Sequence, residues 1–489
     1  DQLKNVQQIQ ATASAFAAIL SDGSVVTWGI AGWGGDSSAV QNQLKNVQQI
    51  QASDYAFAAI LGDGSVVTWG NAVYVGDSTA VQNQLKNVQQ VEKILQKPAD
   101  PNFRDHRELL GLTTLRTVTV QADLEEAVGT LKRRAETALE VGKGRLVDSS
   151  GGVLDVDAPI KRARLQNGDS LVLHIGRVHV QATYGAFAAV LGDRSFVSWS
   201  ARAAGDNSSA VQNQLKNVQQ IQATRVAFAA ILDDGSVVTW GHASYGGDSS
   251  DVQDQLKNVQ QIQASNLAFA AILGDGSVVT WGDAGRGGDS NAVQDHLKNV
   301  QQIQASQGAF AAILGDGSVV TWGEAGYGGD SSAVQNQLKS VQQIQASDSA
   351  FAAILGDGSV VTWGDAGPGG DSSAVQNQLK NVQQIQATAS AFAAILGDGS
   401  VVTWGHASYG GDSSAVQNQL KSVQQIQASD SAFAAILGDG SVVTWGDAGR
   451  GGDSSAVQNQ LKNVQQIQGE LCAFAAIVND GSVVTWGDA

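Results

Sequence analysis

The stretch AFAAILGDGSVVTWG, which occupies Ala268–Gly282 in one of its copies, decides the fold of this chain. It holds two apolar runs of about six residues with β-branched and aromatic side chains. The runs are joined by Gly-Asp-Gly, whose glycines allow the positive φ of a tight hairpin turn. A third run, VQQIQAS at Val259–Ser265, precedes them and alternates more clearly. The sequence therefore predicts three short strands, the last of which ends at the glycine after the tryptophan.

This stretch belongs to a repeat that fills most of the chain. Its tryptophan recurs every 41 residues, except for one interval of 130 residues, which is one repeat plus 89 residues. The tryptophans are Trp28, Trp69, Trp199, Trp240, Trp281, Trp322, Trp363, Trp404, Trp445 and Trp486. We therefore predict ten copies of one unit, with an insertion of 89 residues between Val91 and Val180 in the third copy.

The segment between two copies, typically GGDSSAVQNQLKN, is ambiguous. In one copy Val293, Leu297 and Val300 have the i, i+4, i+7 spacing of a helix. Alternatively, SAVQNQL forms a fourth, outer strand, which is the interpretation that we favour. A unit of 41 residues with about four short strands has the size of a propeller blade. Such a unit cannot bury both faces of its sheet alone, so we expect it to stack on its neighbours.

The motifs DGSVVTWG, SSAVQNQLKNVQQIQAS and AFAAIL resemble the repeat of the RCC1 family (regulator of chromosome condensation). The resemblance covers about 400 residues and implies a mainly β fold, an RCC1-like β-propeller built from ten 41-residue repeats. The unit departs from the family by being shorter and by lacking a histidine before the apolar strand. Family members typically close with seven blades, a number that ten copies do not match.

The copy number leaves three arrangements open. The seven copies in residues 203–489 could close one seven-bladed ring, with the first three copies in another ring. A single larger ring and an open spiral are the alternatives. The predicted domains are residues 1–92 (repeats one, two and the start of three), 93–178 (the insertion) and 179–489 (the remaining repeats).

The insertion has the order and spacing of an α+β, ubiquitin-like β-grasp domain, which it resembles over about 65 residues. The predicted elements are a strand at Thr117–Gln121, a helix at Leu124–Val141 with Asp123 as N-cap, and strands at Arg145–Asp148, Val153–Asp155 and Ser170–Ile175. We expect Lys132, Arg133 and Arg134 to point outward. The resemblance places a partner-binding patch near Val147 and His174. The free Gly-Gly tail of ubiquitin is missing, so we expect the module to serve as a docking surface or a spacer. We do not expect it to be conjugated to a target.

Composition excludes several classes of function. The net charge is −17, and residues 92–180 carry 14 basic and 13 acidic residues, so nearly all of the charge belongs to the repeats. An acidic surface repels phosphate backbones, so we expect no direct nucleic-acid binding. No run of eighteen apolar residues occurs, so no membrane span is expected. The single cysteine, Cys472, excludes an internal disulfide framework and lies in no catalytic motif.

The six histidines have no metal-ligand spacing, so we expect no metal, no cofactor and no catalytic residue. The first ten residues are polar and show no secretory signal. The default expectation is therefore an intracellular protein, in the cytoplasm or the nucleus.

The copies differ from one another mainly at three places, all in predicted loops. Directly after Trp-Gly stand Ile30, Asn71, Ala201, His242, Asp283, Glu324, Asp365, His406 and Asp447. Three residues later stand Trp33, Tyr74, Tyr245, Arg286, Tyr327, Pro368, Tyr409 and Arg450. The third place is the pair before the apolar strand, as in Asp54-Tyr55, Arg225-Val226 and Asn266-Leu267.

Rigid scaffolds carry binding residues on their loops, and Tyr, Trp and Arg are enriched at binding hot spots. We therefore expect a protein-binding face formed by Trp33, Tyr74, His242, Tyr245, Arg286, Tyr327, His406, Tyr409 and Arg450. Drift at unconstrained surface positions is the alternative explanation.

Three functions follow from these features. The first is a non-enzymatic scaffold for protein–protein interaction. The second is guanine-nucleotide exchange on a small GTPase, an activity of some RCC1 proteins. The third is the substrate-binding portion of a ubiquitin ligase, as in the HERC proteins, which join such propellers to a catalytic domain.

Overall fold

The computed structural model describes residues 3–63, 65–71, 118–139, 144–148, 152–163, 165, 169, 171–174, 179–183, 186–191, 193–200 and 208–488. These residues are mainly β, as predicted, and they contain ten antiparallel three-stranded sheets and one two-stranded sheet. We call each three-stranded sheet a blade and number the blades one to ten in chain order.

Each blade has a first, a middle and a third strand. The first strands are β1 (Val6–Thr12), β4 (Val47–Ala52), β9 (His179–Ala182), β12 (Val218–Ala223), β15 (Val259–Ala264), β18 (Val300–Ala305), β21 (Val341–Ala346), β24 (Val382–Ala387), β27 (Val423–Ala428) and β30 (Val464–Glu470). The middle strands are β2 (Ala15–Leu20), β5 (Ala56–Leu61), β10 (Ala186–Val190), β13 (Ala227–Leu232), β16 (Ala268–Leu273), β19 (Ala309–Leu314), β22 (Ala350–Leu355), β25 (Ala391–Leu396), β28 (Ala432–Leu437) and β31 (Ala473–Val478). The third strands are β3 (Val25–Gly29), β6 (Val66–Gly70), β11 (Phe196–Ser200), β14 (Val237–Gly241), β17 (Val278–Gly282), β20 (Val319–Gly323), β23 (Val360–Gly364), β26 (Val401–Gly405), β29 (Val442–Gly446) and β32 (Val483–Gly487).

The middle strand is buried on both faces, which explains its alanines. In β16, Ala268, Ala270 and Ala271 are fully buried although neighbouring residues of a strand point to opposite faces. Small side chains let the adjacent blades approach closely on both sides. Phe269 faces Trp281 of β17 in the register, and the two rings stack with centroids 5.1 Å apart.

In seven of the described blades the aromatic pair joins the blade to the one before it. Trp322 stacks on Phe310 of its own blade and donates its Nε1–H to the carbonyl of Gly287, 3.0 Å away, in the loop of the preceding blade. Gly287 has φ of 97°, and a Cβ there would lie 2.5 Å from the Phe310 ring. This site therefore requires a glycine.

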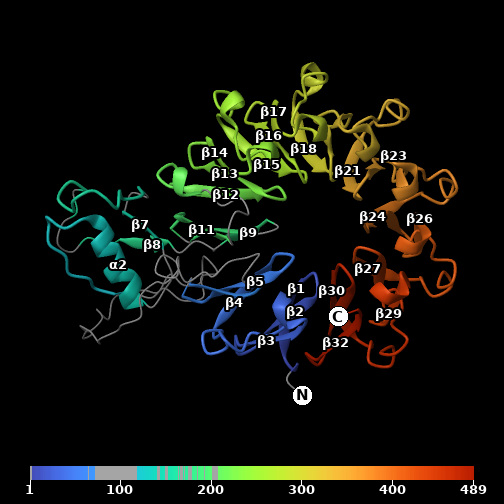
Figure 1. Ribbon diagram of the computed structural model, residues 1–489, viewed down its shortest axis with the longest axis horizontal. Helices are drawn as coiled ribbons and strands as arrows, with labels where there is room; N and C mark the ends of the chain where they lie inside the picture. The colour runs from blue at the N-terminus through green and yellow to red at the C-terminus, as the bar shows by residue number, and fades with distance from the viewer. Residues whose placement is uncertain are drawn as a thin grey trace, which may run out of the picture.

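The ten blades form one ring (Figure 1). Blade ten packs on blade one, because Val6 and Phe16 share a buried cluster with Ala473 and Ile477. The Val6 N–H also donates to the carbonyl of Gly481 at 2.9 Å. Blades two and three, and blades three and four, share buried clusters in the same way. Of the three arrangements left open above, the structure therefore shows the single larger ring. The last seven copies pack on the first three and do not close on themselves.

Where the structure describes it, the segment between blades is neither the outer strand that we favoured nor an α-helix. It consists of turns and short helices, most of them 3₁₀: η1 (Ala31–Trp33), η3 (Ser208–Ala210), η4 (Ala243–Tyr245), η5 (Ser250–Val252), η6 (Ala284–Arg286), η7 (Gln294–His296), η8 (Ala325–Tyr327), η9 (Ala366–Gly370), η10 (Ala407–Tyr409) and η11 (Ala448–Arg450).

Side chains of this segment form hydrogen bonds with backbone groups at the edge of the blade, where an outer strand would otherwise pair. Gln294 donates from Nε2 to the carbonyl of Val278 at 2.8 Å, and Ser290 donates to Gln294 Oε1 at 2.8 Å. Leu297 is fully buried and anchors the end of the segment.

The insertion contributes helix α2 (Val128–Leu139) and an antiparallel pair, β7 (Arg145–Val147) and β8 (Val172–His174). Val128, Leu146 and Ile160 form its small core. No described helix of the chain is long and apolar enough to cross a membrane.

The predicted elements of the insertion are found in part. The helix begins later than Leu124, because Ala127 forms a bridge with Pro159. Asp123 accepts the N–H of Glu125 and caps a turn before the helix, so its predicted role as helix N-cap is wrong. Residues 118–121 form no strand, residue 117 lies outside the described residues, and residues 153–155 contribute a single bridge.

Lys132 points inward, against our prediction, whereas Arg133 and Arg134 are exposed. Its Nζ lies 2.8 Å from Asp193 Oδ2, in the turn between β10 and β11, and 3.5 Å from Glu136 Oε1. Burial raises the pKa of Glu136 above its usual value. Lys132 therefore pairs with the buried Glu136 and the partly buried Asp193, and it ties the insertion to blade three.

Replacing Lys132 by methionine should loosen this junction, because a buried ion pair that loses one partner costs about 3–5 kcal/mol. Amide hydrogen exchange across Val128–Leu139 should speed up at least 10-fold. The matched variant Arg133→Met removes a neighbouring exposed cation and should leave the exchange unchanged. Equal exchange in the two variants would contradict the bridging role of Lys132.

The glycine that contacts the aromatic pair offers a second test. Gly328→Ala places a methyl group 2.6 Å from the Phe351 ring at a φ of 91°, so the free energy of unfolding should fall. The strain and the clash together predict a loss of about 2–4 kcal/mol, measured by urea unfolding. Gly326→Ala, in the same loop with nothing within 4 Å of the new Cβ, is the control and should change it by less than about 1 kcal/mol.

Candidate functional site: the loop face and the central channel

The three variable places of the repeat lie at one end of each blade. In blade four the N–H of His242, directly after the third strand, donates to the carbonyl of Val226 at 3.0 Å, directly before the middle strand. The same bond joins Asp283 to Leu267 and Glu324 to Gly308 in the next blades. Because the strands are antiparallel, these loops share one face of the ring, which we call the loop face.

Side chains of neighbouring blades meet on the loop face. The guanidinium of Arg286, in η6 of blade five, lies 4.6 Å from the centroid of the Tyr327 ring in η8 of blade six. Its Nε is 2.7 Å from Glu324 Oε2. In the same way Trp33 of blade one contacts Tyr55 of blade two, with centroids 4.6 Å apart.

The predicted binding residues are found on this face where the structure describes them. His242 and His406 are exposed and lie edge-on to Tyr245 and Tyr409, respectively. Trp33, Arg286 and Tyr327 are half-buried, and Arg450 is exposed. Tyr74 lies outside the described residues. The positions are thus brought to one surface, while their binding role stays a prediction.

The predicted patch on the insertion offers little surface. Val147 is only 9% exposed and faces Val172 across β7 and β8. His174 lies opposite Arg145 at the end of this pair, and its side chain is outside the description.

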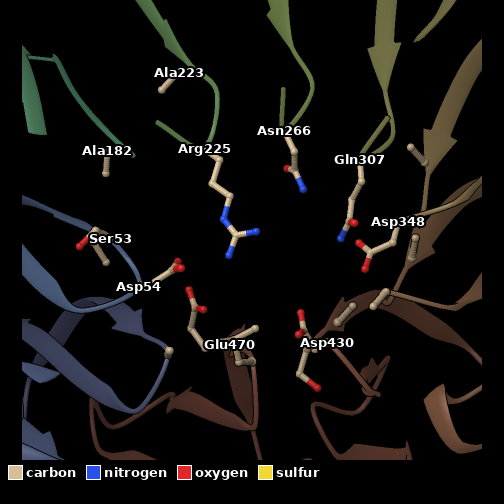
Figure 2. A pocket seen from close by; sticks show the side chains of 18 of the residues that line it. Ser53, Asp54, Ala182, Ala223, Arg225, Asn266, Gln307, Asp348, Asp430 and Glu470 are labelled. Atoms are coloured by element: carbon tan, nitrogen blue, oxygen red, sulfur yellow. The ribbon is translucent and has the colours of Figure 1, made fainter. Parts of the chain in front are cut away.

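A central channel opens between the blades, with a cavity of about 1010 Å³ to which all ten copies contribute. Figure 2 shows its polar lining side chains directed inward: Asp54, Arg225, Asn266, Gln307, Asp348, Asp430 and Glu470. Sequence reasoning singled out Asp54, Arg225 and Asn266 as variable but did not place them in a channel. It missed the other four, although Gln307, Asp348 and Asp430 vary at the same repeat position.

The backbone of these channel residues links neighbouring blades in a series of hydrogen bonds, which we call the collar. The N–H of Arg225 donates to the carbonyl of Asn266 at 3.0 Å, that of Asn266 to Gln307 at 3.3 Å, and that of Gln307 to Asp348 at 3.0 Å. The series continues through Ala389 to Asp430. Because main-chain groups hold neighbouring blades together here, the side chain can change without loss of the contact.

Burial raises the pKa values of four carboxyl groups of the channel, Asp54, Asp348, Asp430 and Glu470, and two of these rises are large. Burial raises the pKa of Glu470 to about 8, with Asp54 and Asp430 nearby adding to the rise. Burial together with Asp430 raises the pKa of Asp348 to about 6, although a hydrogen bond from Gln307 opposes the rise. Glu470 also stands where every other copy has Ser or Thr. Its neutral form at pH 7 avoids a buried negative charge beside two others.

No group of three or more His, Cys, Asp or Glu side chains suited to hold a metal ion occurs in the part of the chain that the structure describes. Cys472 lies in the turn between β30 and β31 of blade ten, next to the channel residue Leu471, and burial raises the pKa of its thiol. A raised pKa makes a thiol a weaker nucleophile at neutral pH.

No protein-family model and no curated protein sequence matches the chain. Solved structures similar to it include yeast RCC1 (Prp20) bound to Kap60, at 15% identity and a TM-score of 0.30, over 48% of this chain and 70% of that chain. Prp20p of Saccharomyces cerevisiae is similar at 12% identity and a TM-score of 0.29, over 66% and 73%. The computationally designed Ika8 protein is similar at 13% identity and a TM-score of 0.30, over 64% and 98%. At these scores the assignment of a propeller rests on the blades and their contacts alone.

Glu470 predicts a pH dependence of stability. Its pKa is about 8 in the folded protein and 4.5 in the unfolded chain, so the folded state retains a proton between these values. Stability from this group is complete below pH 4.5 and is lost as the pH rises through 8. Glu470→Gln should therefore gain stability relative to the parent as the pH rises from 5 to 8.5, by about 1–4 kcal/mol.

Urea unfolding of both proteins at several pH values measures this difference. Parallel pH profiles would show that Glu470 is ionised in the folded protein and would refute the effect.

Proposed function

We propose that the protein is a non-enzymatic scaffold for protein–protein interaction that uses the loop face of the ring. The observation that carries the proposal is the position of the variable side chains. Ten copies keep one framework nearly unchanged, and the sites where they differ share one surface. Aromatic and arginine side chains there are held by contacts such as Arg286 on Tyr327, which lowers the entropy lost on binding.

The competing explanation is sequence drift at unconstrained positions, and it applies in the channel. There the collar of backbone hydrogen bonds joins neighbouring blades whatever side chain is present. On the loop face, by contrast, Trp33 with Tyr55 and Arg286 with Tyr327 are matched across blades. Sequence variation that preserves contacts between side chains of neighbouring blades favours selection for binding over drift. The net charge of −17 favours protein partners over nucleic acid.

The resemblance to RCC1 repeats and to a ubiquitin-like module belongs to this proposal. The insertion, tied to blade three by Lys132 and Asp193, supplies a second surface beside the ring. We place the protein inside the cell, in the cytoplasm or nucleus, as the setting for such partners.

Two alternatives remain as proposals of lower rank: exchange of guanine nucleotides on a small GTPase, and the substrate-binding portion of a HERC-like ligase. One similar structure is described as that of a protein with binding properties toward Gsp1p and histones. Release of a fluorescent GDP analogue from a purified GTPase of this kind, with and without this protein, tests the exchange activity. An accelerated release would replace the scaffold proposal by the exchange proposal.

The loop face is tested by the triple variant Tyr245→Ala, Arg286→Ala, Tyr327→Ala. Immobilised parent and variant are compared for the proteins they capture from a cell extract, quantified by mass spectrometry. Specific partners should fall at least 10-fold with the variant, because hot-spot truncations cost about 2 kcal/mol or more.

The matched control carries Gln260→Ala, Gln301→Ala and Gln342→Ala, which change exposed residues at the opposite end of three first strands. It should capture the same proteins as the parent. Equal capture by all three proteins would remove the loop face from the proposed function. A variant from which residues 93–178 are deleted shows separately which captured proteins depend on the insertion.

A further inference from the structure

The end of β30 in blade ten differs in sequence from the same place in the other blades. Every other copy has alanine followed by serine or threonine there, whereas blade ten has Gly469 and Glu470. In blade five the Oγ of Ser265 accepts the N–H of Ala268 at 3.1 Å and ties the end of the first strand to the middle strand. Glu470 instead points its side chain into the channel (Figure 2), so it supplies no such tie.

The collar is also interrupted at this place. The series that begins at Arg225 ends at Asp430 of blade nine. By repeat register the next bond would run from the N–H of Asp430 to the carbonyl of Leu471, and no such bond occurs among the described residues. In blade ten the first strand instead runs one position further and pairs Glu470 with Ala473 of its own middle strand. Blade ten therefore lacks the main-chain bond by which blades four to nine are joined at this level.

Blades nine and ten nevertheless touch at this end. The main chain of Gly469 lies so close to the carbonyl of Ala428 in blade nine that a Cβ at residue 469 would collide with it. The glycine thus permits a close approach, but the approach brings no hydrogen bond in place of the missing one. The end of β30 can therefore part from blade nine without breaking a collar bond.

The surroundings of Glu470 oppose its charged form. Burial is the main cause of its raised pKa, the carboxyl groups of two other blades add to the rise, and the N–H of Leu471 opposes it. The charged groups around it are these carboxyls and the arginines that act on them: Asp54 with Arg225, and Asp430 with Arg450. Ionisation of Glu470 in the closed arrangement therefore places a further negative charge beside two others.

Movement of this end would be linked to proton release. When the end of β30 leaves blade nine, water reaches Glu470 and its pKa falls from about 8 to the ordinary 4.5. Between these values the closed form holds a proton that the open form gives up. Each pH unit in this range therefore favours opening by up to about 10-fold, and the effect levels off above pH 8.

We propose that the junction of blades nine and ten is a proton-controlled gate of the central channel, in which ionisation of Glu470 parts the end of β30 from blade nine. The collar bonds of blades four to nine keep those blades together, so the movement is confined to blade ten. The gate opens the wall of the channel as the pH rises and closes it as the pH falls. It involves no loop-face residue that the proposed function uses, so the two proposals stand independently.

Amide hydrogen exchange of the full 489-residue protein, followed by mass spectrometry, tests the gate. Two peptides that each occur once in the chain are compared in the same sample: residues 469–478 of blade ten, GELCAFAAIV, and residues 264–273 of blade five, ASNLAFAAIL. The ratio of their exchange rates, corrected for sequence, cancels the general effect of pH on exchange. From pH 5.5 to 8.5 the ratio of blade ten to blade five should rise by about 10-fold or more.

Three variants assign the effect to Glu470. Glu470→Gln removes the titrating group, and Glu470→Ser restores a residue type that the other copies use, so both should hold the ratio nearly constant with pH. Asp348→Asn is the matched control, because it removes another channel carboxyl with a raised pKa at a place where the collar is intact on both sides. Its ratio should rise with pH as in the parent.

Four outcomes would overturn the gate. They are a ratio in the parent that does not rise with pH, an equal rise in Glu470→Gln, an equal rise in Glu470→Ser, and loss of the rise in Asp348→Asn. Acceleration of both peptides together at a constant ratio is a case of the first outcome. It would show that the ring unfolds as a whole, and it would leave the pH dependence of global stability in place.

Discussion

The contact of a loop glycine with the stacked phenylalanine and tryptophan of the next blade is the constraint on which the ring depends. It combines three requirements at one point: a left-handed backbone, a surface without a Cβ, and a carbonyl directed at the indole nitrogen. Seven of the described blades receive this contact from the loop of the blade before them. A sheet of three short strands, which buries too little surface to be stable alone, gains its core from both neighbours. The close approach also explains why the middle strand is rich in alanine.

Much of this fold could be predicted from the sequence. The strands follow from β-branched and aromatic runs between glycines, and the ten copies follow from the spacing of the tryptophans. The segment between blades was predicted wrongly, because the side chain of Gln294 replaces a strand at the edge and periodicity does not report such a bond. Lys132 was placed outward because its partner Asp193 is 61 residues away and belongs to another module. Likewise, the variable column at Asp54 and Arg225 was found, but its inward direction depends on closure of the ring.

Neighbouring blades are joined by main-chain groups in the channel and by side chains on the loop face. In the channel, main-chain bonds from blade to blade hold the collar, so its side chains are free to be acidic, basic or neutral. Glu470 shows the limit of this freedom, because burial beside Asp54 and Asp430 favours its protonated form. On the loop face, side chains of one blade touch those of the next, so that a change at one position affects its neighbour. A partner bound to the loop face, as proposed, would therefore contact pairs of neighbouring blades and not single blades.

The bond between Val6 and Gly481 repeats, at the junction of the two ends, the bond by which every other first strand with a described partner is joined to the preceding turn. Along the edge of the first strand, the junction of the two ends therefore resembles the other described junctions. The order of the units around the circle is cyclic, because the same bond recurs at the described junctions of near-equivalent units. Circular permutation, which joins the two ends and opens another loop, would therefore preserve the set of strand pairings.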